Sequence, residues 1–278
     1  TAAWEVIDNE DFVVNSSLQT FAAGTTSYIY NIPRINLSRS FIYLTSRINS
    51  ATASDTVGGF WAARFDNATR INISRSYTSA TTAGDFHYQV VDWKNSNVQN
   101  GSVRIANGAS IITADISNVN LSNSFIVFSR RSASTNAIDT MINGYFSNSS
   151  RIVFSRLGTT GVVFIEYFVV SSPDINVQTD YLYYGASSTD QNIVLSQVNM
   201  TRTFTMHSSM FDTASTNYGR ALVSRNLSTS TTVRLRKGIA NNNVNVTVFT
   251  VEFLFPDLFP PIINFSSPLN PVLLLSET

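Results

Sequence analysis

Short hydrophobic stretches recur along the whole chain, and Ser, Thr, Asn and Gly clusters separate them. The stretches alternate apolar and polar residues, or run apolar without interruption, over about five to eight residues, which is typical of β-strands joined by turns. Residues 125–128 are apolar in succession, as expected where a strand is covered on both faces. Since no segment sustains a helical period, the pattern predicts an all-β fold.

The chain also repeats itself. A strand-like heptapeptide with Asn at its second position and Phe at its last occurs at 35–41, 119–125 and 198–204. The three asparagines of this motif are Asn36, Asn120 and Asn199, which are separated by 84 and 79 residues. This recurrence at a fixed period predicts tandem structural repeats.

Other repeated motifs have nearly the same spacing. A hydrophobic residue followed by Gln occurs at 18–19, 98–99 and 177–178, with the glutamines 80 and 79 residues apart. Asn67, Asn148 and Asn226 precede a middle strand in each copy, and the segment 229–232 is expected to lengthen the turn in the third. Each copy closes on a hydrophobic strand, at 87–93, 164–170 and 246–253. We therefore expect three β-sandwich repeats, immunoglobulin-like or jelly-roll-like, of about 80 residues each, at 15–95, 96–174 and 175–255.

Both ends extend beyond the repeats. Residues 4–8 resemble a closing strand whose own repeat is missing, so 1–14 is expected to form a strand-like extension. Residues 256–278 form a Pro-interrupted apolar tail, which should not be left in water. Either both ends fold back on their own repeats, or one is exchanged with a neighbouring copy. The residues expected to carry such assembly are Trp4, Val6, Ile7, Ile262, Ile263, Phe265, Val272, Leu273, Leu274 and Leu275.

The amino-acid composition limits the classes of function and the cellular locations that fit this chain. The charge is sparse and balanced, with 18 basic and 18 acidic residues, which argues against nucleic-acid binding. There are no cysteines, so stability must come from packing and sheet hydrogen bonds. A start at Thr1 leads us to expect that a leader has been removed, and with it an extracellular or virion-surface location. The apolar stretches 161–170 and 246–263 contain carboxylates or prolines and are expected to be buried strands rather than membrane spans.

The most abundant motif is the N-glycosylation acceptor Asn-x-Ser/Thr. It begins at Asn15, Asn36, Asn67, Asn72, Asn100, Asn120, Asn148, Asn199, Asn226, Asn245 and Asn264. Much of this number follows from a chain rich in Asn, Ser and Thr, and such side chains also bond their own backbone in turns. Attached glycans and turn formation are both retained as explanations.

Catalytic, metal and cofactor signals are weak. The two histidines, His87 and His207, fall in different repeats, and the carboxylates are scattered. No calcium loop, zinc pair, phosphate loop or dinucleotide motif occurs, although calcium held between domains stays open. We expect no enzyme activity and no cofactor. Most aromatic residues are expected in cores, with Tyr181 and Tyr183 on one strand face as an exposed stripe for stacking on sugars.

The order of these repeated motifs along the chain resembles that of the β-sandwich repeats in phage and virus tail fibres and in secreted bacterial surface fibrils. The likeness covers approximately residues 15–253 and extends in outline to glycan-coated fibrils from environmental water. It implies a self-assembling extracellular filament whose partners are copies of itself and attached glycans. The alternative is a viral or phage receptor-binding protein that recognises host-surface glycans.

Overall fold

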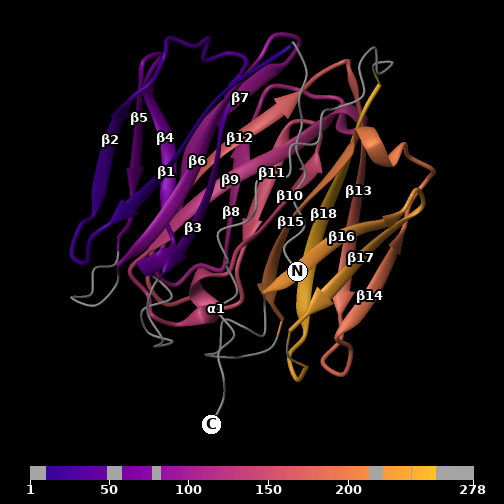
Figure 1. The fold of residues 1–278 in the computed structure, drawn as a ribbon. Helices are drawn as coiled ribbons and strands as arrows, with labels where there is room; N and C mark the ends of the chain where they lie inside the picture. The colour runs from indigo at the N-terminus through magenta and orange to yellow at the C-terminus, as the bar shows by residue number, and fades with distance from the viewer. Residues whose placement is uncertain (1–10, 49–57, 77–82, 213–221, 239, 255–278) are drawn as a thin grey trace.

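The computed structural model describes residues 11–48, 58–76, 83–212, 222–238 and 240–254. They form strands β1–β18, one short α-helix and short 3-10 turns, so the predicted all-β class is confirmed. The strands make six antiparallel sheets of three strands each. We refer to β1–β6, β7–β12 and β13–β18 as strand groups 1, 2 and 3, which lie side by side from left to right in Figure 1.

Group 1 contains two sheets of orders β1-β6-β3 and β2-β5-β4. Its strands are β1 (Phe12–Phe21), β2 (Ser27–Asn31), β3 (Ser40–Ile48), β4 (Ala62–Asn67), β5 (Arg70–Ser74) and β6 (Gly84–Trp93). Strand β1 therefore begins ahead of the expected repeat boundary at residue 15. The expected closing strand is β6, which lies in the middle of its sheet because both β1 and β3 pair with it.

Group 2 has the same arrangement, with sheets β7-β12-β9 and β10-β11-β8. Its elements are β7 (Asn97–Ile105), β8 (Ile111–Asp115), η2 (Leu121–Asn123), β9 (Ser124–Ser132), α1 (Ala137–Thr140), β10 (Asn143–Asn148), β11 (Arg151–Ser155) and β12 (Val163–Ser171). Helix α1 spans a single turn and was not expected from the sequence; the Asn136 side chain caps it by accepting a hydrogen bond from the Ile138 amide.

Group 3 repeats this topology with sheets β13-β18-β15 and β14-β17-β16. Its elements are β13 (Ile175–Tyr184), β14 (Asp190–Val194), η3 (Met200–Arg202), β15 (Thr203–Phe211), β16 (Val223–Thr229), β17 (Thr232–Lys237) and β18 (Val244–Phe253). Each group thus places its first, sixth and third strands in one sheet and its second, fifth and fourth in the other.

Strand register corrects three details of the sequence alignment. Val90, Val169 and Thr250 occupy the same place in the three central strands, and they pair with Asn15, Gln99 and Gln178. The first-group equivalent of Gln99 is therefore Asn15, and the Gln19 mark is displaced by four residues. Gln99 and Gln178 each hold a loop serine by two hydrogen bonds, whereas the first group has Pro33, which has no amide hydrogen, at the serine position.

The turn between the fourth and fifth strands supplies the other two corrections. Asn67 pairs with Arg70, Asn148 with Arg151, and Thr229 with Thr232, each next to a β-bulge. Thr229 is therefore the counterpart of Asn67 and Asn148, and Asn226 lies three residues earlier in β16. The turn has the same length in all three groups, so the expected lengthening at 229–232 is wrong.

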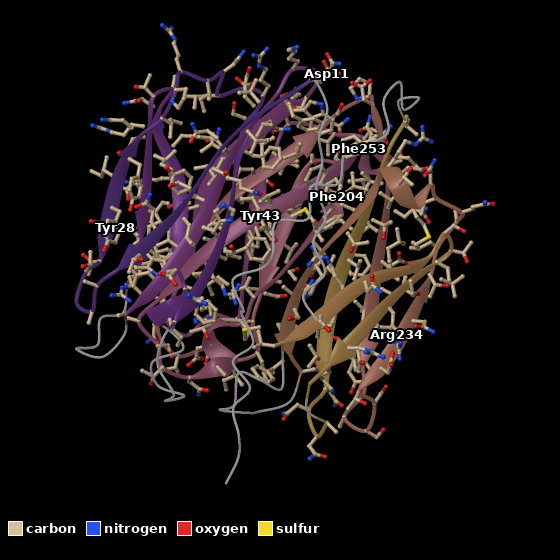
Figure 2. All side chains as sticks on the ribbon, viewed as in Figure 1. Asp11, Tyr28, Tyr43, Phe204, Arg234 and Phe253 are labelled. Carbon is tan, nitrogen blue, oxygen red and sulfur yellow. The ribbon has the colours of Figure 1, made fainter. Side chains whose placement is uncertain are left out.

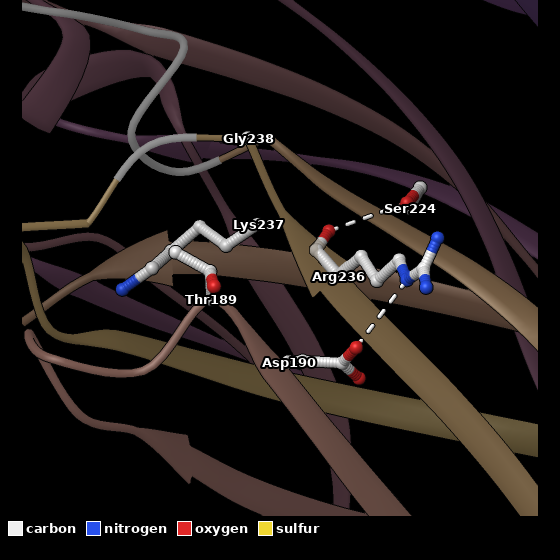
Figure 3. Close-up of a pocket in the computed structure, with 6 residues that line it drawn as sticks. All are labelled: Thr189, Asp190, Ser224, Arg236, Lys237 and Gly238. Atoms are coloured by element: carbon white, nitrogen blue, oxygen red, sulfur yellow. Dashed lines mark hydrogen bonds and ion pairs between the residues drawn. The ribbon is translucent and has the colours of Figure 1, made fainter.

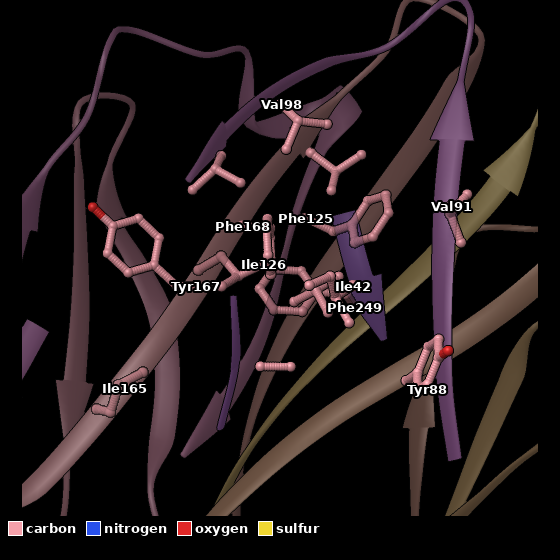
Figure 4. Packing of buried hydrophobic residues seen from close by; sticks show 14 of the residues in the cluster. Ile42, Tyr88, Val91, Val98, Phe125, Ile126, Ile165, Tyr167, Phe168 and Phe249 are labelled. Carbon is pink, nitrogen blue, oxygen red and sulfur yellow. The ribbon is translucent and has the colours of Figure 1, made fainter. Parts of the chain in front are cut away.

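Hydrophobic packing continues across the groups. One cluster of buried residues takes members from all three, including Ile42, Phe125 and Phe249 (Figure 4). A second cluster is centred on group 3 and includes Tyr184, Phe211 and Leu235. Trp61 and Trp93 are also buried, in agreement with the expectation that most aromatic side chains pack in cores. The groups are therefore joined by shared core packing and are not separated by exposed linkers.

Candidate assembly and glycosylation sites

The contact between groups 1 and 2 recurs between groups 2 and 3. The Ala63 amide on β4 donates a hydrogen bond of 2.9 Å to Ser129 Oγ on β9, and the Gly144 amide on β10 donates one of 3.0 Å to Ser208 Oγ on β15. Ala63 and Gly144 hold the same register position in their sheets, as do Ser129 and Ser208 in theirs. An edge strand of one group thus docks on the next group in the same way twice.

Aromatic side chains repeat alongside these hydrogen bonds. The rings of Phe65 and Phe168 meet edge to face with centroids 5.6 Å apart, and those of Phe146 and Phe249 meet in the same way at 6.0 Å. Such pairs contribute about 0.5–1.5 kcal/mol beyond the area they bury. In each case the first ring belongs to a β4-type edge strand and the second to the central strand of the following group.

Among the described residues, the corresponding outward face of group 1 is more exposed at Val14. Val14 pairs with Val91, at the position that Val98 holds in group 2 and Val177 in group 3. Val98 and Val177 are each 5% exposed, whereas Val14 is 47% exposed. In groups 2 and 3 the turn of the preceding group covers this position: Ser38 O accepts from the Val98 amide at 2.7 Å, and η2 packs against β13.

Five of the predicted acceptor asparagines shape turns. The side-chain Oδ1 of Asn120 accepts hydrogen bonds from both the amide and the hydroxyl of Ser122, at 3.1 and 2.9 Å. The same pair of bonds to the residue two positions later occurs at Asn36, Asn67, Asn148 and Asn199. All five asparagines are exposed. The structure therefore supplies a local reason for Asn-x-Ser/Thr at these positions that does not depend on glycans.

The other predicted acceptors lie within strands or outside the described residues. Asn15, Asn72, Asn100, Asn226 and Asn245 are in β1, β5, β7, β16 and β18 respectively. Of these, Asn100 and Asn226 are exposed and the rest are half-buried. Asn264 lies outside the described residues, as do all ten predicted assembly residues, Trp4, Val6, Ile7, Ile262, Ile263, Phe265, Val272, Leu273, Leu274 and Leu275.

A side-chain pair fixes the turn before the third strand in two groups. Arg39 Nε donates to Asp92 at 2.5 Å, and Arg202 approaches Glu252 at 3.9 Å. Register places Asn123 and Ser171 at the same two positions of group 2, where no charge is present. The arginine and the carboxylate have changed together, which indicates that the pairing itself matters for this turn. It also accounts for two of the scattered carboxylates as structural groups.

Three further carboxylates, Asp66, Asp85 and Glu166, also face arginine. Asp66 lies 3.6 Å from Arg64 and 3.3 Å from Arg70, and Asp85 pairs with Arg47. Burial raises the pKa of Glu166, while a hydrogen bond from Ser102 and the charges of Arg64 and Arg131 lower it. Within the described ranges, no group of three His, Asp or Glu side chains is arranged to hold a metal ion.

Buried cations at the end of the fifth strand were not recognised as a set from the sequence. Arg75 follows β5, Arg156 follows β11, and Lys237 is the last residue of β17. Their exposed fractions are only 2%, 2% and 3%. Arg156 donates to the backbone carbonyls of Ala106, Ala109, Asp139, Thr160 and Gly161 at 2.9–3.1 Å. Lys237 donates to the carbonyls of Gly185 and Asn242, and Arg75 lies over the Phe21 and Trp61 rings. The available signal in the sequence was the Ser-Arg dipeptide at 74–75 and 155–156, which Arg236-Lys237 replaces in group 3.

A surface hollow lies beside Lys237 in group 3. It is lined by Thr189, Asp190, Ser224, Arg236, Lys237 and Gly238 (Figure 3). Asp190 pairs there with both Arg234 and Arg236, and hydrogen bonds from Arg234 hold the pKa of this carboxyl below its usual range. Asp190 offsets only one of the two arginine charges, so the hollow keeps a net positive charge.

A second cavity of about 300 Å³ lies where the three groups meet. Equivalent residues of β3, β9 and β15 line it, namely Tyr43, Val127 and Met206, so each group contributes its third strand to this cavity. His207 also lines it and faces Arg225, whose Nη1 lies 3.2 Å from the imidazole Nδ1. Burial and the charge of Arg225 lower the pKa of His207 to about 3. His87 lies in β6, in a different group.

No known protein-family model and no curated protein sequence matches this chain. None of the helices in the described ranges has the length and apolar character needed to cross a membrane.

Proposed function

We propose that this chain is the structural subunit of a self-assembling, N-glycosylated extracellular filament, built from three tandem copies of one six-strand sandwich. The repeat is supported by the shared strand order of the three groups and by contacts at equivalent positions, such as Ala63–Ser129 and Gly144–Ser208. Neighbouring subunits join when a terminal segment of one copy binds the next. Such a head-to-tail contact generates an open polymer rather than a closed ring.

The observation that carries the proposal is the uncovered apolar face of group 1. Val14 is 47% exposed, whereas its counterparts Val98 and Val177 are buried beneath the preceding group, and Leu18 on the same strand face is 55% exposed. Apolar side chains that share a strand face mark an interaction surface when they are left exposed. Within the part of the chain that the structure describes, β1 is an edge strand whose one partner is β6, so its outer edge adds main-chain hydrogen-bonding groups next to this face.

Glycosylation is proposed at the exposed turn asparagines. Asn36, Asn120 and Asn199 occupy the same turn of each group, and Asn67 and Asn148 share another. A sugar on the side-chain amide nitrogen of each of these asparagines extends into solvent. The Oδ1 atom of the same side chain then keeps its hydrogen bonds.

Negative-stain electron microscopy of the native protein, with mass spectrometry of its Asn-containing peptides, tests this function. Filaments whose peptides carry hexose-type mass additions are expected. Deletion of residues 262–278 should leave monomers, and a truncated chain that still polymerises would exclude exchange of the C-terminal segment. Discrete particles with unmodified asparagines would overturn the proposal as a whole.

The second candidate is a receptor-binding protein of a virus or phage. Tyr181 and Tyr183 favour it, because they share one face of β13 and are 57% and 55% exposed. Aromatic faces of this kind stack on sugars. Tyr181 is already engaged with Tyr145 at a ring distance of 5.6 Å, which leaves Tyr183 as the accessible ring. Measurable affinity of a monomer or trimer for host glycans, lost in Tyr183→Ala, would favour this candidate.

A further inference from the structure

The outward face of sheet β1-β6-β3 contains an apolar stripe along β1. Phe12, Val14 and Leu18 lie on the same side of the strand because alternate residues share a face. Phe12 is half-buried, and Val14 and Leu18 are about half exposed. The stripe ends at a polar group, in which Thr20 and Arg47 both bond to Asp85. The apolar part of this face therefore runs from Phe12 to Leu18 and ends at the polar cluster of Thr20, Arg47 and Asp85.

The equivalent positions in the other groups are engaged. Register places Ser102 of β7 and Tyr181 of β13 at the position of Leu18. Ser102 donates to Glu166, and the Tyr181 hydroxyl donates to Phe146 O of group 2 at 3.1 Å. Val14 has the two buried valines Val98 and Val177 as counterparts. Where a strand group precedes it, this face is therefore covered at the valine position, while Ser102 and Tyr181 stay exposed at the position of Leu18.

The last described residues lie beside the Phe12 end of the stripe. The ring of Phe253, the last residue of β18, lies 5.6 Å from that of Phe12 and 5.7 Å from that of Trp93. Asp11, Phe204 and Phe253 lie at the same end of the molecule (Figure 2). Residues that follow Leu254 therefore leave the fold next to the first residue of the stripe.

The sequence beyond this point suits the stripe in length and chemistry. Phe12 and Leu18 are six residues apart on an extended strand, a distance of roughly 20 Å. Six or seven extended residues span that distance, and residues 256–278 contain Leu258, Phe259, Ile262, Ile263 and Phe265. Pro256, Pro260 and Pro261 favour an extended backbone that cannot continue a hydrogen-bonded ladder. Such a segment binds through its apolar side chains.

We propose that the chain's own C-terminal segment, residues 256–278, covers the Val14–Leu18 face of group 1. The segment takes the place that the preceding group occupies on groups 2 and 3. This inference deepens the proposed function, since the same face becomes the acceptor when the segment is exchanged between copies in the filament.

Single cysteines test the inference, because the chain has none of its own. Leu18→Cys reports on the proposed face, and Ile29→Cys on the outer face of β2 is the matched control. The two side chains are 55% and 58% exposed in the described residues, so their thiols should react at equal rates if nothing covers the stripe. With the full-length chain and a maleimide reagent, Leu18→Cys is expected to react at least tenfold more slowly than Ile29→Cys. Equal rates would overturn the inference.

A second variant shows that the segment itself provides the protection. Ile262→Asp/Ile263→Asp in the Leu18→Cys background keeps the chain length but places two charges in the segment. The Leu18→Cys rate should rise to that of Ile29→Cys, while the far-ultraviolet circular dichroism spectrum stays unchanged. Protection that survives these charges would assign the cover to another part of the molecule and overturn the inference.

The same reagent separates this inference from the proposed function. Protection in diluted monomers, with no filaments at any concentration, would support the inference and contradict the filament. Protection that appears only in filaments and disappears on dilution would keep the filament but reject the chain's own segment as the occupant.

Discussion

The amide of Gly144 donates a hydrogen bond to the hydroxyl of Ser208, and this bond joins strand groups 2 and 3. Ser208 Oγ also lies 2.8 Å from Asn143 Oδ1. Gly144 is buried, so its amide has no access to water if the hydroxyl is removed. The group boundary is therefore held by specific polar contacts as well as by the Phe146–Phe249 rings.

Ser208→Ala should lower the free energy of unfolding by about 1–3 kcal/mol, because it leaves a buried backbone donor without a partner. Urea denaturation followed by tryptophan fluorescence measures the change. Ser27→Ala, at an exposed position of β2, should stay within about 0.5 kcal/mol of the parent. Equal midpoints for the two variants would show that the contact does not contribute to stability.

Arg156→Met should cost about 3 kcal/mol or more, since several buried carbonyls lose their donor at once. Arg156→Lys should lose less than half as much, because group 3 places Lys237 at the same position with two carbonyl bonds. The exposed Arg151→Lys is the control and is expected within about 0.5 kcal/mol of the parent. A loss of similar size in the Met and Lys variants would contradict the role of the cation as a donor to the loops.

Asn120→Asp and Asn120→Gln separate the two explanations of the acceptor motifs. Aspartate keeps a side-chain oxygen at the turn and removes the glycan acceptor, whereas glutamine removes both. The free energy of unfolding of the unglycosylated protein should fall by about 1 kcal/mol in the glutamine variant and by a few tenths in the aspartate variant. Peptide mass spectrometry of native material should show loss of the glycan in both. Equal stability of the glutamine variant and the parent would remove the turn explanation.

Stability should fall as the pH is lowered through the acidic range, partly because of His207. Its pKa is about 3 in the folded protein and about 6.5 when unfolded, so the unfolded chain takes up a proton first. The contribution of the neutral imidazole is complete above pH 6.5 and is lost progressively toward pH 3, with a total of about 5 kcal/mol.

His207→Gln should flatten this part of the curve of unfolding free energy against pH. His87→Gln is the comparison variant, because burial lowers the pKa of His87 as well. A parallel pH dependence in His207→Gln and the parent would exclude the imidazole as its source.

The sequence by itself determined the class of fold and much of its periodicity. Alternating apolar residues predicted strands, and the positions of β6, β12 and β18 agree with the expected closing strands. These signals are local, because strand faces follow the two-residue repeat of the backbone. Turn motifs were equally readable at Asn36, Asn120 and Asn199, where each side chain bonds the residue two positions later.

Only the tertiary structure decided which repeated residues are equivalent and what they contact. The sequence aligned Gln19 and Asn226 with their apparent counterparts, while strand pairing gives Asn15 and Thr229. Register depends on partners far along the chain, and a short motif does not specify it. For the same reason the exposure of Val14 could not be read from the sequence: it resembles Val98 and Val177 in type and place, and it differs because no strand group precedes it in the described chain.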